Sequence, residues 1–226
     1  MSIEIYKKGD TPVIRGVLFD MAGLVLDTEK LYSRFWMEAC HFYGYPMTYE
    51  QSLSMRAANS HVGAQNLQLF FGPEIDYKTI RDKRVELMDA FIAENGVEPK
   101  PGIFELMDFL EEQGIPAAIT SSSPADRIRA HLSSLGLYHR FAAICSGYDV
   151  PCGKPAPDIY LHGAASLSLD PKNCLALEDA PLGIESAFRA GCVPVMVPDQ
   201  APPDEQTKAM LYAKADSLAD IIDLLK

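Results

Sequence analysis

Several features are scarce in this sequence, and each scarcity excludes a class of protein. The five cysteines are widely spaced and include no C-x-x-C pair, which fits a reducing cytoplasm better than a disulfide framework. Lysine and arginine number 20 against 31 aspartate and glutamate residues and form no cluster, so nucleic acid is not an expected partner. No apolar run is long enough for a signal peptide or a membrane span. We therefore expect a cytoplasmic protein without a membrane partner, and we expect a monomer.

The residues that are present indicate an acidic, globular protein. The chain has 226 residues, and 48% of them are hydrophobic, which is enough for one large domain or for a core with a smaller insert. The formal net charge of -11 is explained most simply as a contribution to solubility. The sequence contains no internal repeat and no low-complexity tract, so its organisation has to be found in the pattern of apolar residues.

The first part of the chain predicts one strand followed by a long helical stretch. Residues 13–19 are apolar and β-branched at their start, and they predict a buried strand with Asp20 at its carboxyl end. From residue 28 to about residue 95 the apolar residues recur at helical spacing, and the stretch ends at an Asn-Gly pair. This stretch therefore predicts several consecutive helices without intervening strands.

The second part of the chain predicts an α/β fold. After Pro101 short apolar strands alternate with amphipathic helices, which implies right-handed crossovers and a parallel sheet covered on both faces. We predict a Rossmann-like core formed by residues 1–26 and 97–226. An all-helical domain at residues 27–96 is predicted as an insert in this core.

Polar residues end or follow several of the predicted strands. Because the carboxyl ends of parallel strands lie at one edge of a sheet, ligands bind there, near the point where the strand order reverses. Taken singly, each residue has an ordinary interpretation as a helix cap, a turn or a solvated side chain. Taken together, they predict one site. The residues are Asp20, Ser121, Ser122, Ser123, Lys154, Glu178 and Asp179.

The chemistry of these residues indicates a metal ion and a phosphate group. Asp20, Glu178 and Asp179 supply hard oxygen ligands, and a few carboxylates completed by water and substrate phosphate are typical of Mg²⁺. Ser121 offers a hydroxyl group, and the N–H groups that follow it open a helix, where anions bind. The lysine adds a point charge that suits phosphate. Clustered carboxylates would repel one another without a cation, so we predict a Mg²⁺ cofactor and a phosphorylated ligand.

Four ordered motifs carry a resemblance to a known family. They are LFDMAGLVLDTE, ITSSSP, GKPAPDIY and LALEDAPLGIESAFRAG, and the resemblance spans nearly the whole chain. The chain resembles the haloacid dehalogenase-like superfamily, in its phosphatase and sugar-phosphate mutase branch with a helical cap inserted after the first strand. This resemblance implies a hydrolase that works through an aspartyl-phosphate.

The resemblance also implies a role for each residue of the site. Asp20 would attack phosphorus in line, and such covalent catalysis splits one hard step into two easier ones. Mg²⁺ would be held by Asp20, Asp179 and the backbone carbonyl of Ala22, with Glu178 near the ion or its waters. The phosphoryl oxygens would be held by Ser121, Ser122 and Lys154.

Ala22 departs from the family motif, which carries an aspartate there as general acid and base. Positioned proton transfer is worth about 10²–10⁴-fold in rate, so the alanine puts turnover in doubt. Phosphate binding is expected to be preserved.

Four explanations stay open: an alanine substituted into an ordinary phosphatase, a natural enzyme with slow turnover, a phosphate-binding pseudoenzyme, and phosphonoacetaldehyde hydrolysis. The last chemistry uses a lysine of the cap, and the comparable stretch SLSMRAANSHVG contains none, so we rank it below ester hydrolysis.

The helical insert is expected to select the leaving group. Its candidate substrate contacts are Thr28, Tyr32, Arg56 and His61. The sugar-phosphate mutases that the chain resembles carry a histidine at the position of Tyr32, so a phosphatase is favoured over a mutase. The expected substrate is a small phosphorylated metabolite, such as a sugar or nucleoside monophosphate. His61 offers another source of the missing proton step, because an imidazole changes charge near neutral pH.

Overall fold

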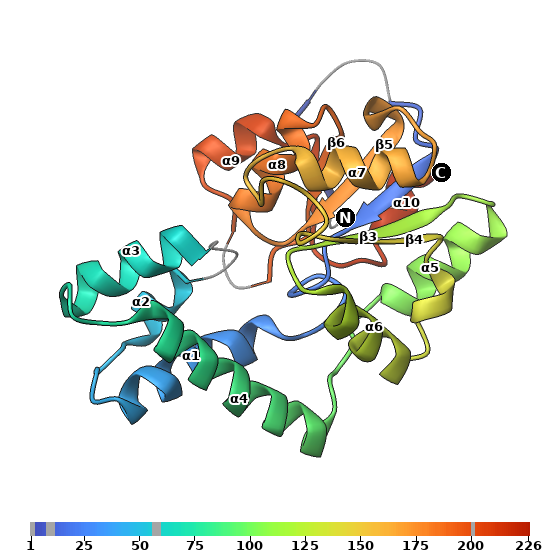
Figure 1. Ribbon diagram of the computed structural model, residues 1–226. Coiled ribbons are helices and arrows are strands. Elements are labelled where there is room, and N and C mark those ends of the chain that lie inside the picture. The colour runs from blue at the N-terminus through green and yellow to red at the C-terminus, as the bar shows by residue number, and fades with distance from the viewer. Residues whose placement is uncertain (1–2, 8–11, 56–59, 200–201) are drawn as a thin grey trace. The chain divides into compact units, whose positions relative to one another are not determined.

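The computed structural model describes residues 3–7, 12–55, 60–199 and 202–226. The chain divides into two compact units, which are described separately. The core unit comprises residues 1–26 and 98–226, and the helical unit comprises residues 27–97. Figure 1 traces both units along the chain.

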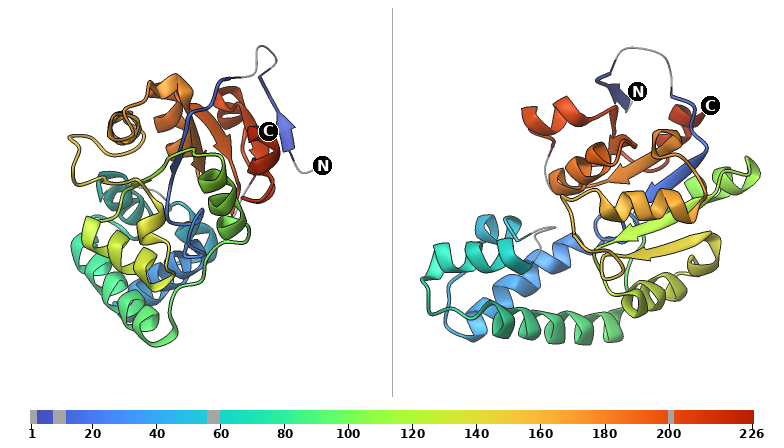
Figure 2. Two further views of the ribbon diagram at one scale, coloured as in Figure 1. Left: turned by 90° about the vertical axis from the view of Figure 1, so that its right-hand side faces the viewer. Right: turned by 45° about the horizontal axis from the view of Figure 1, so that its top comes forward.

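A mostly parallel sheet forms the centre of the core unit, as Figures 1 and 2 show. Within the described residues it has seven strands in the order β1-β7-β6-β5-β2-β3-β4. The edge strand β1 pairs antiparallel with β7, and every other neighbouring pair is parallel. The α/β prediction is therefore confirmed. The strands are β1 (Ile3–Ile5), β2 (Gly16–Phe19), β3 (Ala117–Ser121), β4 (Ala143–Ser146), β5 (Cys174–Glu178), β6 (Val193–Met196) and β7 (Ala213–Ala215).

The central strands β2, β3 and β5 are short, mostly apolar runs in which every residue is buried. Such runs are typical of parallel strands, because helices cover both faces of the sheet. The chain passes from β2 to β3 and β4 on one side, and then continues with β5, β6 and β7 on the other side. The strand order therefore reverses at β2, which is where ligands bind in open α/β sheets.

Helices of the core unit pack against this sheet. Helix α7 contacts β2, β3, β4 and α8, while α8 contacts β5 and β6. Ile159 and Tyr160 of α7 belong to one apolar cluster with Leu18 of β2 and Ala118 of β3. The helices of the unit are α5 (Ile103–Glu112), α6 (Ala125–Ser134), α7 (Asp158–Ser166), α8 (Pro181–Arg189), α9 (Glu205–Met210) and α10 (Ile221–Leu225). Two 3₁₀ turns lie at Tyr138–Arg140 and Pro171–Asn173.

The helical unit has an apolar core of its own, which contains the buried residues Trp36, Met47, Leu67 and Ile80. Local sequence explains where two of its helices begin. Thr48 and the glutamine three residues later form a capping box at α2, and the Asp76 carboxylate accepts two backbone N–H groups at α4. The helices are α1 (Glu29–Phe42), α2 (Tyr49–Leu53), α3 (Ser60–Phe71) and α4 (Tyr77–Asn95).

None of the helices in the described part of the chain is long and apolar enough to cross a lipid bilayer. All five cysteines are free, and only Cys152 is exposed. Burial raises the pKa of the Cys40 thiol to about 12 and that of Cys192 to about 12. These two thiols therefore pack as small apolar groups and do not act as nucleophiles.

Candidate active site

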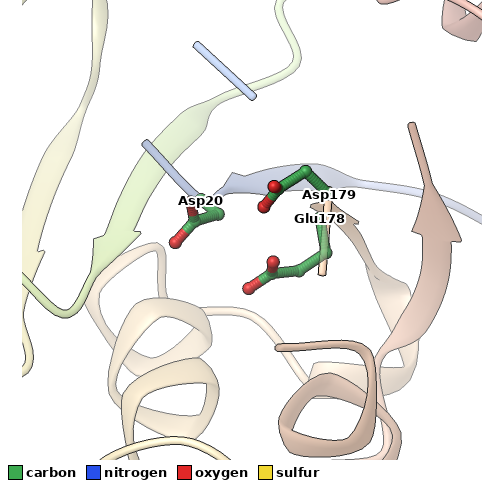
Figure 3. Close-up of side chains that lie close together, drawn as sticks. All are labelled: Asp20, Glu178 and Asp179. Atoms are coloured by element: carbon green, nitrogen blue, oxygen red, sulfur yellow. The ribbon is translucent and has the colours of Figure 1, made fainter. Parts of the chain in front are cut away.

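The ends of β2 and β5 bring three carboxylates together, as Figure 3 shows. Asp20 directly follows β2, Glu178 ends β5, and Asp179 follows it. The parallel register pairs Phe19 with Leu177, so the next residues of both strands lie at the same edge of the sheet. Each carboxylate offers an oxygen atom, and these oxygens lie within 4.8 Å of one another. All three side chains are buried.

Lys154 places a positive charge between two of these carboxylates. Its Nζ atom lies 2.6 Å from Asp20 Oδ1 and 2.5 Å from Glu178 Oε1. Only 4% of the residue is exposed. Burial by itself lowers the pKa of Lys154, but the charges of Asp20 and Glu178 and their hydrogen bonds outweigh burial and hold the pKa above its ordinary value. The ammonium group therefore stays protonated and connects the ends of the two strands.

The donor set fits a Mg²⁺ ion. When the three carboxylates are ionised, they are buried like charges that repel one another strongly, and the Lys154 ammonium group offsets part of this charge. A divalent cation would remove this repulsion. Hard carboxylate oxygens that leave room for water and phosphate are the ligands that Mg²⁺ prefers. The residues that could hold the ion are Asp20, Glu178 and Asp179.

Tyr160 also belongs to this cluster, and the sequence analysis did not single it out. Its hydroxyl group donates a hydrogen bond to Glu178 Oε1 at 2.6 Å, and its ring centroid lies 5.2 Å from Lys154 Nζ. The side chain is fully buried on α7. Burial raises the pKa of Tyr160 well above its ordinary value, and the charges of Glu178 and Asp20 raise it further. The hydroxyl therefore acts as a donor that fixes one oxygen of Glu178.

Gly183 gives the Glu178 carboxylate its space. A Cβ atom built on Gly183 would lie within 2.3 Å of all three atoms of that carboxyl group. Such an approach is impossible for any other residue without displacing the carboxylate or the helix backbone. Gly183 lies in the first turn of α8, which starts with Pro181, a residue that is favourable there. The glycine of PLGIESAFRAG is thus explained by the buried glutamate that precedes it.

The predicted phosphate ligands lie at the end of β3, next to β2 in the sheet. Ser121 is buried, and its Oγ accepts a hydrogen bond from the Ser123 N–H group at 3.2 Å. Ser122 is exposed, and helix α6 begins at Ala125. The register pairs Phe19 with Ile119, so Asp20 and Ser121 both lie just beyond that pair. This placement suits an anion-binding site formed by a hydroxyl group and the N-terminus of a helix.

The loop that carries Ala22 is closed by its own backbone. The N–H groups of Val25 and Leu26 both bond to the carbonyl of Met21 at 2.9 Å, and the N–H of Gly23 bonds to the carbonyl of Leu26 at 2.8 Å. Gly23 has a φ of 84°, a conformation that side chains with a Cβ rarely adopt. Ala22 is half-buried in this loop. Its position is therefore fixed by backbone bonds that do not depend on the alanine side chain.

The four candidate substrate contacts belong to the helical unit. Thr28 is buried, whereas His61 is exposed in the first turn of α3. The ring of Tyr32 lies 4.9 Å from the guanidinium carbon of Arg84, a buried arginine that the sequence analysis did not single out. Arg56 lies outside the described residues. The roles of these residues stay predictions.

The family follows from a comparison with known protein families. Residues 14–191 match the model of the haloacid dehalogenase-like hydrolases. This match covers more than half of the chain, which therefore belongs to that family. It includes β2, β3, β5 and the cluster formed by Asp20, Lys154, Glu178 and Asp179.

Two curated relatives are phosphatases by name. The fructose-1-phosphate phosphatase YqaB of Escherichia coli (strain K12) is 28% identical over 176 residues, which cover 78% of this chain and 92% of that protein. Hexitol phosphatase A of the same organism is 29% identical over 204 residues, covering 88% of this chain and 91% of the relative. The chain is accordingly a hydrolase of the phosphatase type.

Solved structures show the same fold. CbbY from Rhodobacter sphaeroides, in complex with phosphate, superimposes with a TM-score of 0.73 at 24% identity and covers 92% of this chain and 96% of its own. A beta-phosphoglucomutase from Clostridium difficile gives a TM-score of 0.72 at 21% identity, covering 92% of this chain and 93% of its own. At these identities the comparison establishes the fold.

Proposed function

We propose that the chain is a Mg²⁺-dependent phosphatase-type hydrolase that cleaves a small phosphorylated metabolite through an aspartyl-phosphate on Asp20. The observation that supports this most directly is the buried cluster at the strand ends, in which Lys154 bridges Asp20 and Glu178 beside Asp179. Grouping buried charges in this way is costly for stability. The arrangement is understandable if a cation and a phosphoryl group bind to it.

Each polar group of the cluster has a part in the proposed reaction. One carboxylate oxygen of Asp20 attacks phosphorus, and Lys154, 2.6 Å away, orients that carboxylate and balances charge on the phosphoryl oxygens. The hydroxyl group of Ser121 and the N–H groups that lead into α6, including that of Ser122, hold the remaining oxygens. Bound Mg²⁺ would add electrostatic stabilisation of the phosphoryl group. Its ligands would be Asp20, Glu178, Asp179 and the backbone carbonyl of Ala22.

The proposed substrate is a phosphate ester of a sugar or nucleoside. The names of two relatives, a fructose-1-phosphate phosphatase and a hexitol phosphatase, support a sugar phosphate. We propose that the helical unit selects the leaving group as a cap. The side chains proposed for that selection are Thr28, Tyr32, Arg56 and His61.

Ala22 limits turnover in this proposal, because a methyl group neither protonates a leaving alkoxide nor activates water. The same residue supports a second candidate, a phosphate-binding pseudoenzyme that keeps the anion site without hydrolysis. A panel of phosphate esters separates the two candidates. Phosphate release is measured for this chain, for Ala22→Asp and for Ala22→Asn, each with Mg²⁺. We expect Ala22→Asp to gain about 10²-fold or more over this chain.

The asparagine variant is the matched control, because it has nearly the shape of aspartate but does not exchange a proton. If Ala22→Asn gains as much as Ala22→Asp, the gain comes from packing and the proton argument is wrong. If neither this chain nor Ala22→Asp releases phosphate from any ester, the proposed hydrolase activity is wrong. Magnesium-dependent binding of inorganic phosphate, measured by calorimetry, would then support the pseudoenzyme.

A further inference from the structure

The turn that follows β4 lies beside the proposed phosphate-binding loop, residues 121–123, which ends β3. The register of the two parallel strands pairs Ser121 with Ser146, so the chain leaves both strands at the same level of the sheet (Figure 1). The turn is closed by its own bonds. The N–H of Ser146 donates to Asp149 Oδ2 at 3.3 Å, and the N–H of Asp149 donates to the carbonyl of Ser146 at 3.0 Å. Residues 146–149 therefore form a defined support next to the loop.

Two hydrogen bonds from this turn hold carbonyl groups of the loop. The N–H of Gly147 donates to the carbonyl of Ser121 at 2.7 Å. The Ser146 hydroxyl group donates to the carbonyl of Ser123 at 2.8 Å and accepts the N–H of Tyr148 at 3.1 Å. Ser146 is buried, so water does not readily replace these bonds. The turn thus anchors the first and the last residue of the loop.

The bond to Ser121 determines which way the next backbone N–H group points. In a trans peptide such as this one, the C=O and N–H groups lie in one plane and point in opposite directions. The carbonyl of Ser121 points towards the turn after β4. The N–H of Ser122 therefore points away from β4, towards the side of β3 on which β2 and Asp20 lie. That is the side on which the proposed reaction places the phosphoryl group.

Gly147 allows the turn to approach the loop closely enough to make these bonds. A Cβ atom built on Gly147 would lie 3.0 Å from Ser122 Cα and 3.4 Å from the carbonyl oxygen of Ser121. Both are backbone atoms, so a side chain would fit only if the loop moved by a few tenths of an ångström. A Cβ atom on Gly153, in the same connection, would meet no heavy atom of the described residues within 4 Å, apart from its chain neighbours. Alanine at these two glycines therefore compares a crowded position with an open one.

We propose that Ser146 and Gly147 are positioning residues that direct the N–H of Ser122 towards the bound phosphoryl group. The inference rests on the proposed function, and it assigns a role to residues that act through the loop and do not touch the phosphoryl group. Strand β3 separates β4 from β2, and the proposed metal ligands lie at the ends of β2 and β5. Phosphate affinity consequently depends on Ser146 and Gly147, whereas Mg²⁺ affinity does not.

Calorimetry with inorganic phosphate in the presence of Mg²⁺ tests this proposal, and titration with Mg²⁺ alone measures the metal site separately. We expect Ser146→Ala and Gly147→Ala each to weaken phosphate binding about 10-fold, because an anchoring bond is lost or strained. Both variants should keep the Mg²⁺ affinity of the unsubstituted chain. Gly153→Ala is the matched control and should alter neither affinity. Ser146→Thr retains the hydroxyl group and should recover most of the phosphate affinity that Ser146→Ala loses.

The possible failures are distinguishable. If Ser146→Ala and Gly147→Ala bind phosphate as tightly as the unsubstituted chain, the positioning role is wrong and the proposed function stands. If the affinities for Mg²⁺ and phosphate fall together, the turn supports the fold as a whole and the inference is overturned. An equal loss in Gly153→Ala would contradict the argument from close approach. If the unsubstituted chain binds no phosphate with Mg²⁺, the anion site of the proposed function fails, and the inference fails with it.

Discussion

At the scale of single residues, the oxygen Oε1 of Glu178 is held by two buried donors. It accepts hydrogen bonds from both Lys154 and Tyr160, at 2.5 and 2.6 Å. A carboxylate held in this way has little freedom to rotate. Tyr160 is therefore a positioning residue: it acts on the proposed ion through Glu178 and does not reach the substrate itself. Partners of this kind typically affect metal affinity by 10–100-fold.

Tyr160→Phe tests that role. The substitution removes one hydroxyl group and keeps the buried ring, so the fold should survive while Glu178 loses one of its two donors. We expect Mg²⁺ affinity, measured by calorimetry without substrate, to fall about 10-fold. Tyr43→Phe, at an exposed tyrosine of the helical unit, is the matched control and should leave affinity unchanged. Unaltered Mg²⁺ binding in Tyr160→Phe would show that the hydroxyl group serves only packing.

The sequence predicts some of these residues better than others. Asp20 and Glu178 directly end apolar runs, so strand geometry alone places them at one edge of a parallel sheet. Tyr160 gives no such signal. It lies on a helix in which other large residues are also apolar, and a buried tyrosine is ordinarily explained by packing. Only the crossing of α7 over the sheet brings its hydroxyl group to Glu178, and that crossing is not encoded in a local pattern.

At the scale of elements, α8 and the end of β5 depend on one another. Helix α8 follows Glu178 after only two residues, and its first turn passes over the carboxyl group of that glutamate. Gly183 makes this close approach possible, because a Cβ atom there would lie 1.9 Å from Glu178 Oε1. The strand, the turn and the helix therefore form a single structural unit around one buried carboxylate.

Gly183→Ala should disrupt this unit. The added methyl group occupies the space of the Glu178 carboxylate, so either the carboxylate rotates away or the helix shifts. We expect the midpoint of thermal unfolding to fall by several degrees and Mg²⁺ binding to weaken more than 10-fold, beyond what the lost stability explains. Glu185→Ala, on the same helix, is the control, because its ion pair with Arg189 is partly exposed and contributes little. Normal Mg²⁺ binding in Gly183→Ala would contradict the steric argument.

The short edge strands show where prediction from the sequence ends. Strands β1 and β7 contain three residues each, which is too few for a period of two to be recognised. Their pairing joins residues 3–5 to residues 213–215, so it depends on the completed sheet. Strand β2 likewise begins at Gly16, later than the apolar run that starts at Val13. The central strands were predictable because burial on both faces requires continuous apolar runs.

At the scale of the whole molecule, the alternation of strands and helices was sufficient to predict the α/β class. The point of strand reversal at β2 then determines where polar residues can gather. The local sequence pattern does not predict which residues of the helical unit contact a substrate. Those contacts depend on side chains that are separated by long stretches of sequence. The proposed metal site belongs entirely to the core unit, since its ligands lie outside residues 27–97.

Magnesium should therefore stabilise the core unit selectively. The only tryptophan of the chain, Trp36, lies in the apolar core of the helical unit, so its fluorescence reports unfolding there. Mg²⁺ at about 100 times its dissociation constant raises the free energy of unfolding of the unit that binds it by about 2.7 kcal/mol. Each unit has its own apolar core. In urea unfolding, we therefore expect Mg²⁺ to move part of the circular dichroism transition to a higher urea concentration, while the transition reported by Trp36 fluorescence moves less.

Asp179→Asn should abolish the shift. Equal displacement of both signals would mean that the two units unfold as one, and an unchanged curve would mean that Asp20, Glu178 and Asp179 hold no magnesium.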